Sequence, residues 1–252
     1  MVSRNSLYQE LNALFQPELF KDYAPNGLQV QGREEVRRLV TGVTASEALI
    51  KEAIRRKADA IFVHHGYFWQ GEDPCLVGMK YHRVKLLVEH GISLFAYHLP
   101  LDAHPELGNN AQLGKKLGFI TETGLEPDNP RSIGLAGSLD QPVSGEELAR
   151  RIGGVLQRKP LHIAGTDRKI SKVAWCTGGA QGYIDRAVAL GVDAYITGEV
   201  SEQTVHIARE RAIHFFAAGH HATERYGPMA TGARLAEKFD LNHEFIDDPN
   251  PV

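Results

Sequence analysis

Apolar residues along the chain follow two periods. The helical period marks residues 5–15, whose apolar positions Leu7, Leu11, Leu14 and Phe15 predict an amphipathic helix. Short runs rich in β-branched and apolar residues predict strands at 37–46, 58–63 and 91–99. Helical patterns at 46–57 and 81–90 separate them, and Ser46 is the predicted N-cap of the first. The alternation predicts parallel strands joined by crossover helices.

The same alternation returns in the second half of the chain. "ADAIFVHHG" at 58–66 aligns with "VDAYITGEV" at 192–200, and "ISLFAY" at 92–97 aligns with "IHFFAA" at 213–218. We interpret this as a gapped internal duplication of a strand-helix-strand-helix-strand unit, with chance similarity between buried strands as the alternative. The predicted fold class is α/β: two similar, interleaved lobes with largely parallel sheets and a metal site in the cleft between them.

The segment 124–172 is predicted to be the junction and the opening of the second lobe, because it is rich in proline and glycine. Within it, "SGEELARRIGGVL" predicts a capped helix. We place the first lobe at residues 1–125, completed by 219–252, and the second lobe at 126–218.

Composition and charge exclude several classes of protein. The net charge of -3 provides no broad basic field, so nucleic acid is possible as a partner but not indicated. No apolar run approaches the roughly 18 residues of a membrane span, and the start of the chain lacks the apolar stretch of a signal peptide, so we expect a cytoplasmic protein without a membrane partner. Two cysteines are too few for a disulfide framework, and Cys176 lies in an apolar strand where we expect it to be inert.

Histidines gather where predicted strands end. The three groups are "VHHGYFW", with His64 and His65; "HLPLDAHPELGNN", with His98 and Asp102; and "GHHATER", with His220 and Glu224. A lone histidine is most often structural, but three groups at the carboxyl ends of three strands predict a shared metal site. At a strand end, Gly66 lets His64 and His65 splay toward two ions, and a carboxylate can bridge them. Neutral imidazoles with carboxylates suit zinc, iron, manganese, nickel or cobalt.

Longer motifs carry a resemblance to a known family. "DYAPNGLQV", "TGVTAS", "VHHGYFW", "HLPLDAHPELGNN", "TGEVSEQ" and "AGHHATER" span residues 22–225. They resemble the Ngg-interacting-factor-three-like family, also labelled GTP cyclohydrolase I type 2, in its short bacterial form. The resemblance implies a toroidal homohexamer with two metal ions per subunit. It assigns His65 and Asp102 to one ion and His64 and His220 to the other, and Glu224 is shared.

The sequence also contains less specific signals for proton transfer, base stacking and phosphate binding. His98 and Glu199 are predicted to move protons in the cleft, although a capping or supporting role is the default for Glu199. The turn "CTGGAQG" resembles an anion cradle, yet we favour a turn without ligand. For the aromatics of "GYFWQGE" we favour packing over base stacking.

Two functions from different classes remain open. The preferred one is a dinuclear metal-dependent hydrolase that acts on a nucleotide or a related ring amide through a metal-activated water. The alternative is a non-catalytic metal-binding scaffold or regulatory protein with a protein or nucleic-acid partner.

Overall fold

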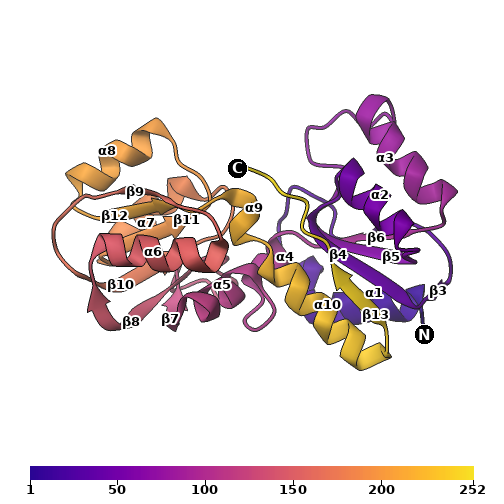
Figure 1. The fold of residues 1–252 in the computed structure, drawn as a ribbon, viewed down its shortest axis with the longest axis horizontal. Helices are drawn as coiled ribbons and strands as arrows, with labels where there is room; N and C mark the ends of the chain where they lie inside the picture. The colour runs from indigo at the N-terminus through magenta and orange to yellow at the C-terminus, as the bar shows by residue number, and fades with distance from the viewer. The chain divides into compact units, whose positions relative to one another are not determined.

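The computed structural model describes residues 1–252, which form two compact units (Figure 1). Unit 1 comprises Met1–Leu101 and Gly227–Pro249, and unit 2 comprises Asp102–Tyr226 and Asn250–Val252. The sequence-based lobes have different boundaries, because the segment after residue 101 already contributes to the second sheet. Its strand β7 pairs antiparallel with β8 in unit 2.

Unit 1 is built on a five-stranded sheet of order β13-β4-β5-β6-β2. The strands β13, β4, β5 and β6 run parallel, and β2 pairs antiparallel with β6 at the edge. In chain order the elements are β1 Val2–Ser3, α1 Arg4–Phe15, the 3₁₀ helix η1 Pro17–Leu19, β2 Gly27–Val30, β3 Glu35–Val36, β4 Arg38–Thr44, α2 Glu47–Arg55, β5 Ala60–His65, α3 Gly78–Glu89, β6 Ser93–Ala96, α4 Leu99–Ala103, α10 Tyr226–Phe239 and β13 Asn242–Phe245. The first residue of α10 and the last two of α4 lie across the unit boundaries.

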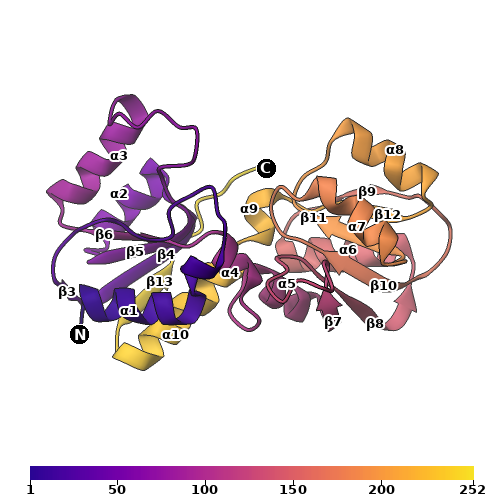
Figure 2. The same ribbon diagram turned by 180° about the vertical axis from the view of Figure 1, so that it is seen from behind.

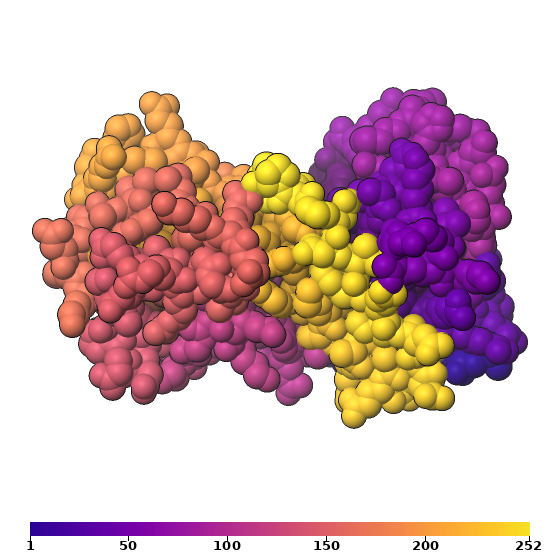
Figure 3. Space-filling model, in the orientation of Figure 1, coloured from indigo at the N-terminus to yellow at the C-terminus, as the bar shows by residue number.

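Helices cover both faces of the unit 1 sheet (Figure 1). On one face α2 and α3 pack on alternate strand residues such as Ile61 and Val63. On the other face α1 and α10 pack on Ala60 and Phe62. Alternate residues of a strand point to opposite faces, so one strand supplies both cores. Figure 3 shows the yellow C-terminal residues of this unit packed beside its indigo and purple N-terminal residues.

Unit 2 is built on a six-stranded mixed sheet of order β7-β8-β10-β11-β12-β9. Its central strands β10, β11 and β12 are parallel, and β7, β8 and β9 form antiparallel pairs toward the edges. The elements are α5 Asn109–Leu117, β7 Phe119–Gly124, β8 Leu135–Val143, α6 Gly145–Leu156, β9 Leu161–Ile163, β10 Ile170–Trp175, the 3₁₀ helix η2 Gln181–Tyr183, α7 Ile184–Ala189, β11 Ala194–Thr197, α8 Glu202–Glu210, β12 His214–Ala217 and α9 His220–Thr223.

The faces of the second sheet are also both covered. Helix α6 lies in front of the sheet in Figure 1 and α7 lies in front of it in Figure 2, so these helices pack on opposite faces. The N-terminus of α6 is a capping box in which Ser144 and Glu147 each accept from the other's backbone N–H. Its Leu148, Ile152 and Leu156 are buried at a spacing of four residues. The capped helix that the sequence predicts here is confirmed.

Both units contain the order β-α-β-α-β with three neighbouring parallel strands. In unit 1 this is β4-α2-β5-α3-β6, and in unit 2 it is β10-α7-β11-α8-β12. The mixed α/β class with largely parallel sheets is therefore confirmed, and Ser46 caps α2 as predicted. The duplication stays a prediction from the sequence. No helix in the chain has both the length and the apolar character that crossing a membrane requires.

Candidate functional site

Two candidate metal ligands of unit 1 lie at the end of strand β5. His64 and His65 are its last residues, and their side chains leave opposite faces of the strand. Their ring centroids are nevertheless 4.5 Å apart, at an interplanar angle of 44°. The two rings therefore meet near one place at the strand end, as the sequence predicts.

Each of these imidazoles is oriented through its Nδ1 atom. His64 Nδ1 lies 3.1 Å from the carbonyl oxygen of Tyr97, which can only accept, so Nδ1 carries the proton and Nε2 carries the lone pair. His65 Nδ1 lies 3.1 Å from the hydroxyl of Thr44, its register partner on β4. Such contacts fix the ring and the tautomer of metal-binding histidines.

A third imidazole belongs to the same place. His98 follows β6, and its Nδ1 donates to Asp22 Oδ1 at 2.8 Å. Asp22 also accepts from the backbone N–H of Leu99 and from Asn26. Burial favours the neutral acid, but the hydrogen bond and charge of His98 outweigh it and lower the pKa of Asp22 to about 2. Asp22 is thus an ionised partner that orients His98.

The three histidines together could hold a metal ion. One ligand atom from each of His64, His65 and His98 lies within 4.8 Å of the other two. His64 is 1% exposed, so the group is partly shielded from water. Imidazoles held by a carbonyl, a hydroxyl and a carboxylate match the chemistry of a transition-metal site. The sequence assigned His98 to proton transfer, and that role stays a prediction.

Unit 2 brings a different donor set together at the ends of its strands. His220 begins α9, and its Nδ1 lies 2.6 Å from Glu199 Oε1, while its Nε2 lies 3.3 Å from Glu224 Oε2. Burial opposes protonation of His220, but the hydrogen bonds and charges of Glu224 and Glu199 outweigh it and raise its pKa to about 9. The Glu224 side chain is 3% exposed. One imidazole therefore sits between two carboxylates.

The remaining predicted ligand of unit 2 is Asp102. It is buried, and its Oδ1 accepts from Asn109 Nδ2 at 2.9 Å and from Thr177 Oγ1 at 3.3 Å. The neighbouring His104 has a different task, since its Nδ1 accepts backbone N–H groups of Glu106 and Leu107. His104 therefore shapes the loop after α4.

Two backbone N–H groups of the glycine-rich turn after β10 bind side chains of unit 2. Thr177 N donates to Asn110 Oδ1, and Gly178 N donates to Thr223 Oγ1. Gly178 has φ +70°, and a Cβ there would lie 2.1 Å from Glu224 Oε1. The turn therefore needs glycine so that Glu224 can approach the backbone, which favours the interpretation without a phosphate.

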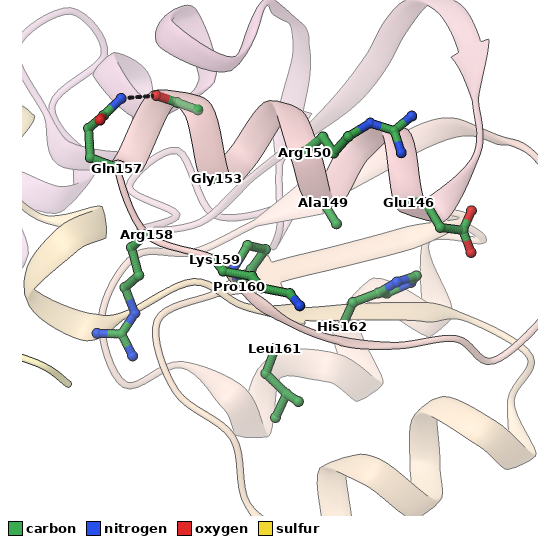
Figure 4. Close-up of a pocket in the computed structure, with 11 residues that line it drawn as sticks. Glu146, Ala149, Arg150, Gly153, Gln157, Arg158, Lys159, Pro160, Leu161 and His162 are labelled. Atoms are coloured by element: carbon green, nitrogen blue, oxygen red, sulfur yellow. Dashed lines mark hydrogen bonds between the residues drawn. The ribbon is translucent and has the colours of Figure 1, made fainter.

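Two adjoining cavities lie on unit 2. One of about 790 Å³ lies between α6 and the segment 158–162 (Figure 4). A second of about 560 Å³ is lined by Glu199 and shares Arg158 and Lys159 with the first. Figure 4 shows Arg158 and Lys159 pointing in different directions from the loop that precedes β9. The space beside Glu199 is thus bordered by two cations.

The three aromatic residues of "GYFWQGE" lie in two places: two pack against the core, and one lies beside the candidate metal ligands. Tyr67 and Phe68 pack against the core between α2, α3 and the sheet. Trp69 instead lies 6.0 Å from His65 and 5.0 Å from His98, measured between ring centroids. The preference for packing is therefore supported for the first two aromatics and not for Trp69.

Sequence reasoning missed the residues that orient the donors. Asp22 and Asn26 lie in the motif "DYAPNGLQV", and Thr44 lies in "TGVTAS", but neither motif follows a predicted histidine-bearing strand. Asn109 and Asn110 end the motif "HLPLDAHPELGNN". Adjacent asparagines after a proline-restricted ligand loop were the available signal for these supporting contacts.

Known proteins resemble this chain over its whole length. The family model described as Duf34/NIF3 (NGG1p interacting factor 3) matches residues 2–251. A Pseudomonas aeruginosa protein named GTP cyclohydrolase 1 type 2 homolog is 57% identical over 251 residues, which is 100% of this chain and 99% of that protein. The solved structure of protein ybgI, described as of unknown function, has a TM-score of 0.96 at 53% identity, and both chains are covered completely. A solved structure from Thermus thermophilus has a TM-score of 0.90 at 31% identity, again with complete coverage of both. The predicted resemblance is confirmed, and the chain belongs to the Duf34/NIF3 family.

Proposed function

We propose that the chain is a dinuclear metal-dependent hydrolase that acts on a nucleotide or a related ring amide. The observation that carries the proposal is that the proposed ligands His64 and His65 converge within 4.8 Å of one another and of His98, the proposed proton carrier, and that the Nδ1 atom of each has an oxygen partner. The proposed ligands are those that the resemblance implies: His64, His65, Asp102, His220 and Glu224. When bound, two divalent transition-metal ions would supply Lewis acidity and a water of lowered pKa.

The chain's own residues have separable tasks in this proposal. Tyr97 and Thr44 hold the rings of His64 and His65 so that Nε2 is the donor atom. Asn109 and Thr177 fix the Asp102 carboxylate, which restricts it to one orientation. These contacts place the ligands before a metal arrives, which reduces the entropy lost on binding.

Proton transfer is assigned to His98 and Glu199. His98 is oriented by an ionised Asp22, which is the arrangement of a base held by a carboxylate. Glu199 contacts His220 and Gln181 and also lines the 560 Å³ cavity, so it reaches both a ligand and open space. In the proposal each carries a proton between substrate and solvent.

Metal content tests the ligand assignment. Elemental analysis of protein purified without chelator should give close to two transition-metal ions per chain. Glu224→Ala should lose both, because the shared carboxylate is absent, and His65→Ala should lose at least one. His82→Ala, which removes an exposed histidine on α3, serves as the matched control and should keep both. Undiminished metal in Glu224→Ala contradicts the shared assignment.

Activity tests the hydrolase assignment. Metal-loaded protein is screened against nucleotides, cyclic amides and phosphoesters beside His65→Ala and His82→Ala. Hydrolysis that disappears only in His65→Ala supports the proposal. If the metal-loaded protein hydrolyses nothing in the panel, the scaffold or regulatory alternative replaces it.

Assembly is a separate proposal that rests on the family resemblance. We propose a toroidal homohexamer of this chain. Light scattering of the purified protein should give a mass six times that of the 27.8 kDa chain. A monomer or dimer at micromolar concentration contradicts it.

A further inference from the structure

The loop that follows the unit 1 donors has an unusual backbone conformation. Phe68 has φ 65°, in the left-handed region that a bulky aromatic residue rarely adopts. A conformation of this kind persists only when the surroundings impose it, and such residues cluster at functional sites. The unusual conformation of Phe68 therefore suggests that a side chain of this loop has a function.

Neighbouring contacts hold this loop from three sides. Gln29 accepts from the backbone N–H of Tyr67 at 2.7 Å and donates to its carbonyl at 3.1 Å. The Tyr67 hydroxyl donates to the carbonyl of Ala45 at 2.6 Å. At Gly66 a Cβ would lie 2.1 Å from Gln29 Oε1, so only glycine fits. These contacts fix the two residues that precede Phe68.

The consequence is the position of Trp69. Its ring is 6.0 Å from His65 and 5.0 Å from His98, and it meets the latter edge to face at 83°. Tyr23 lies beside it, with ring centroids 6.4 Å apart and an interplanar angle of 32°. Tyr23 is 54% exposed, and neither ring belongs to the hydrophobic clusters of unit 1. The loop thus places Trp69 beside Tyr23, outside the hydrophobic clusters of unit 1 and next to His65 and His98.

We propose that Trp69 and Tyr23 form a stacking surface for the planar heteroaromatic ring of the substrate. Stacked aromatic rings have centroids about 4.5–7 Å apart, so a ring stacked on Trp69 lies within reach of a group bound at His65 or His98. The space between Tyr23 and Trp69 is too narrow for an inserted ring, which needs roughly 3.5 Å on each side. The substrate ring therefore stacks on an outer face of the pair. This inference rests on the proposed function and adds the place where the ring of its substrate, a planar nitrogen heterocycle such as a purine, is bound.

Tryptophan fluorescence gives a direct readout of such stacking. The chain has two tryptophans, and the other, Trp175, is fully buried and donates its Nε1–H to the carbonyl of Asn110. Metal-loaded protein is titrated with guanosine, GTP and inorganic tripolyphosphate. Guanosine and GTP should quench the emission of Trp69 saturably, and tripolyphosphate should not. Trp175→Phe should keep the quenching, which assigns the signal to Trp69.

Binding of the same probes to variants, measured by calorimetry, separates stacking from packing. Trp69→Leu should weaken the binding of guanosine and GTP by about tenfold or more, since the stacking of one base contributes a free energy of that magnitude. Trp69→Phe keeps a ring and should stay within about threefold of the parent affinity. Tyr81→Leu removes an exposed aromatic of α3 and serves as the matched control, with no expected change.

The outcomes distinguish this inference from the proposed function. Metal content is measured in every variant: a Trp69→Leu protein that retains its metal and loses guanosine supports the stacking surface. Parent affinity for guanosine in Trp69→Leu overturns it, as does equal quenching by tripolyphosphate. If the protein takes up no metal but still binds guanosine saturably and through Trp69, the metal proposal is overturned. The stacking surface then remains supported.

Discussion

Strands β5 and β11 occupy the same position in the β-α-β-α-β order of their units, but their carboxyl ends carry different chemistry. Strand β5 ends in His64 and His65, whose Nδ1 atoms contact uncharged oxygens of the chain. Strand β11 ends at Thr197, and Glu199 follows it and binds His220. One strand end presents imidazoles with uncharged partners, and the other presents a carboxylate in an ion pair.

The two sets of candidate ligands are held in different ways before a metal binds. In unit 1 uncharged oxygen partners, the carbonyl of Tyr97 and the hydroxyl of Thr44, orient the rings of His64 and His65. In unit 2 the carboxylates Glu199 and Glu224 stabilise the protonated form of His220, whose pKa is raised to about 9. A metal ion and this proton compete for the same nitrogens. The unit 2 donors are therefore held by an internal ion-pair network that a metal must replace.

Crowding the candidate ligands of unit 2 should have a large effect on stability. In Gly178→Ala the new Cβ would lie 2.1 Å from Glu224 Oε1 and 3.1 Å from His220 Nε2, at a backbone φ of +70°. Strain and overpacking together should lower the free energy of unfolding by about 3 kcal/mol. Urea unfolding measures this loss, and elemental analysis should show reduced metal.

Gly182→Ala is the matched control within the same turn, because a Cβ there meets nothing within 4 Å. It should change the free energy of unfolding by less than about 0.5 kcal/mol. Equal stabilities of the two variants would mean that Gly178 is not required for the approach of Glu224.

The second effect is a pH dependence of stability in protein freed of metal by chelation. Because the pKa of His220 is raised from 6.5 to about 9, its ion pairs stabilise the fold fully below pH 6.5. That contribution, on the order of 2 kcal/mol, is lost as the pH rises through about 9. Urea unfolding between pH 6 and pH 10 measures it.

One variant in each unit shows which carboxylate causes the alkaline loss of stability. Glu199→Gln removes one carboxylate from His220 and should flatten the alkaline decline. The pKa of Asp22 in unit 1 is lowered from 3.8 to about 2, so its contribution is present above pH 3.8 and is lost as the pH falls through 2. Asp22→Asn should therefore leave the alkaline decline intact. An alkaline decline of parent size in Glu199→Gln contradicts the role given to that carboxylate.

The sequence predicts the parallel core of each unit because buried strands and amphipathic helices have strong periodicity. Strands β7 and β8 escaped prediction: β7 is exposed along four of its six residues, and β8 carries Asp140 and Pro142, so neither shows an apolar run. Histidine clusters marked the candidate site because they are rare at strand ends. The orienting contacts of Asp22 with His98 could not be read from the sequence, since residues 76 positions apart meet only in the fold.

The two thiols of the chain should differ in reactivity. Cys75 in unit 1 is exposed, whereas Cys176 in unit 2 is buried, and burial together with the charges of Asp102 and Glu224 raises the pKa of its thiol. A thiol reagent at pH 8 should modify Cys75 at least about 100-fold faster than Cys176, because the latter reacts only when unit 2 opens. Timed labelling measured by mass spectrometry shows this as one added group, and Cys75→Ser should abolish the fast phase. Since Cys176 lies two residues before Gly178, the Gly178→Ala variant should accelerate the slow phase; a slow phase unchanged in that variant would mean that the crowding is absorbed without loosening the end of β10.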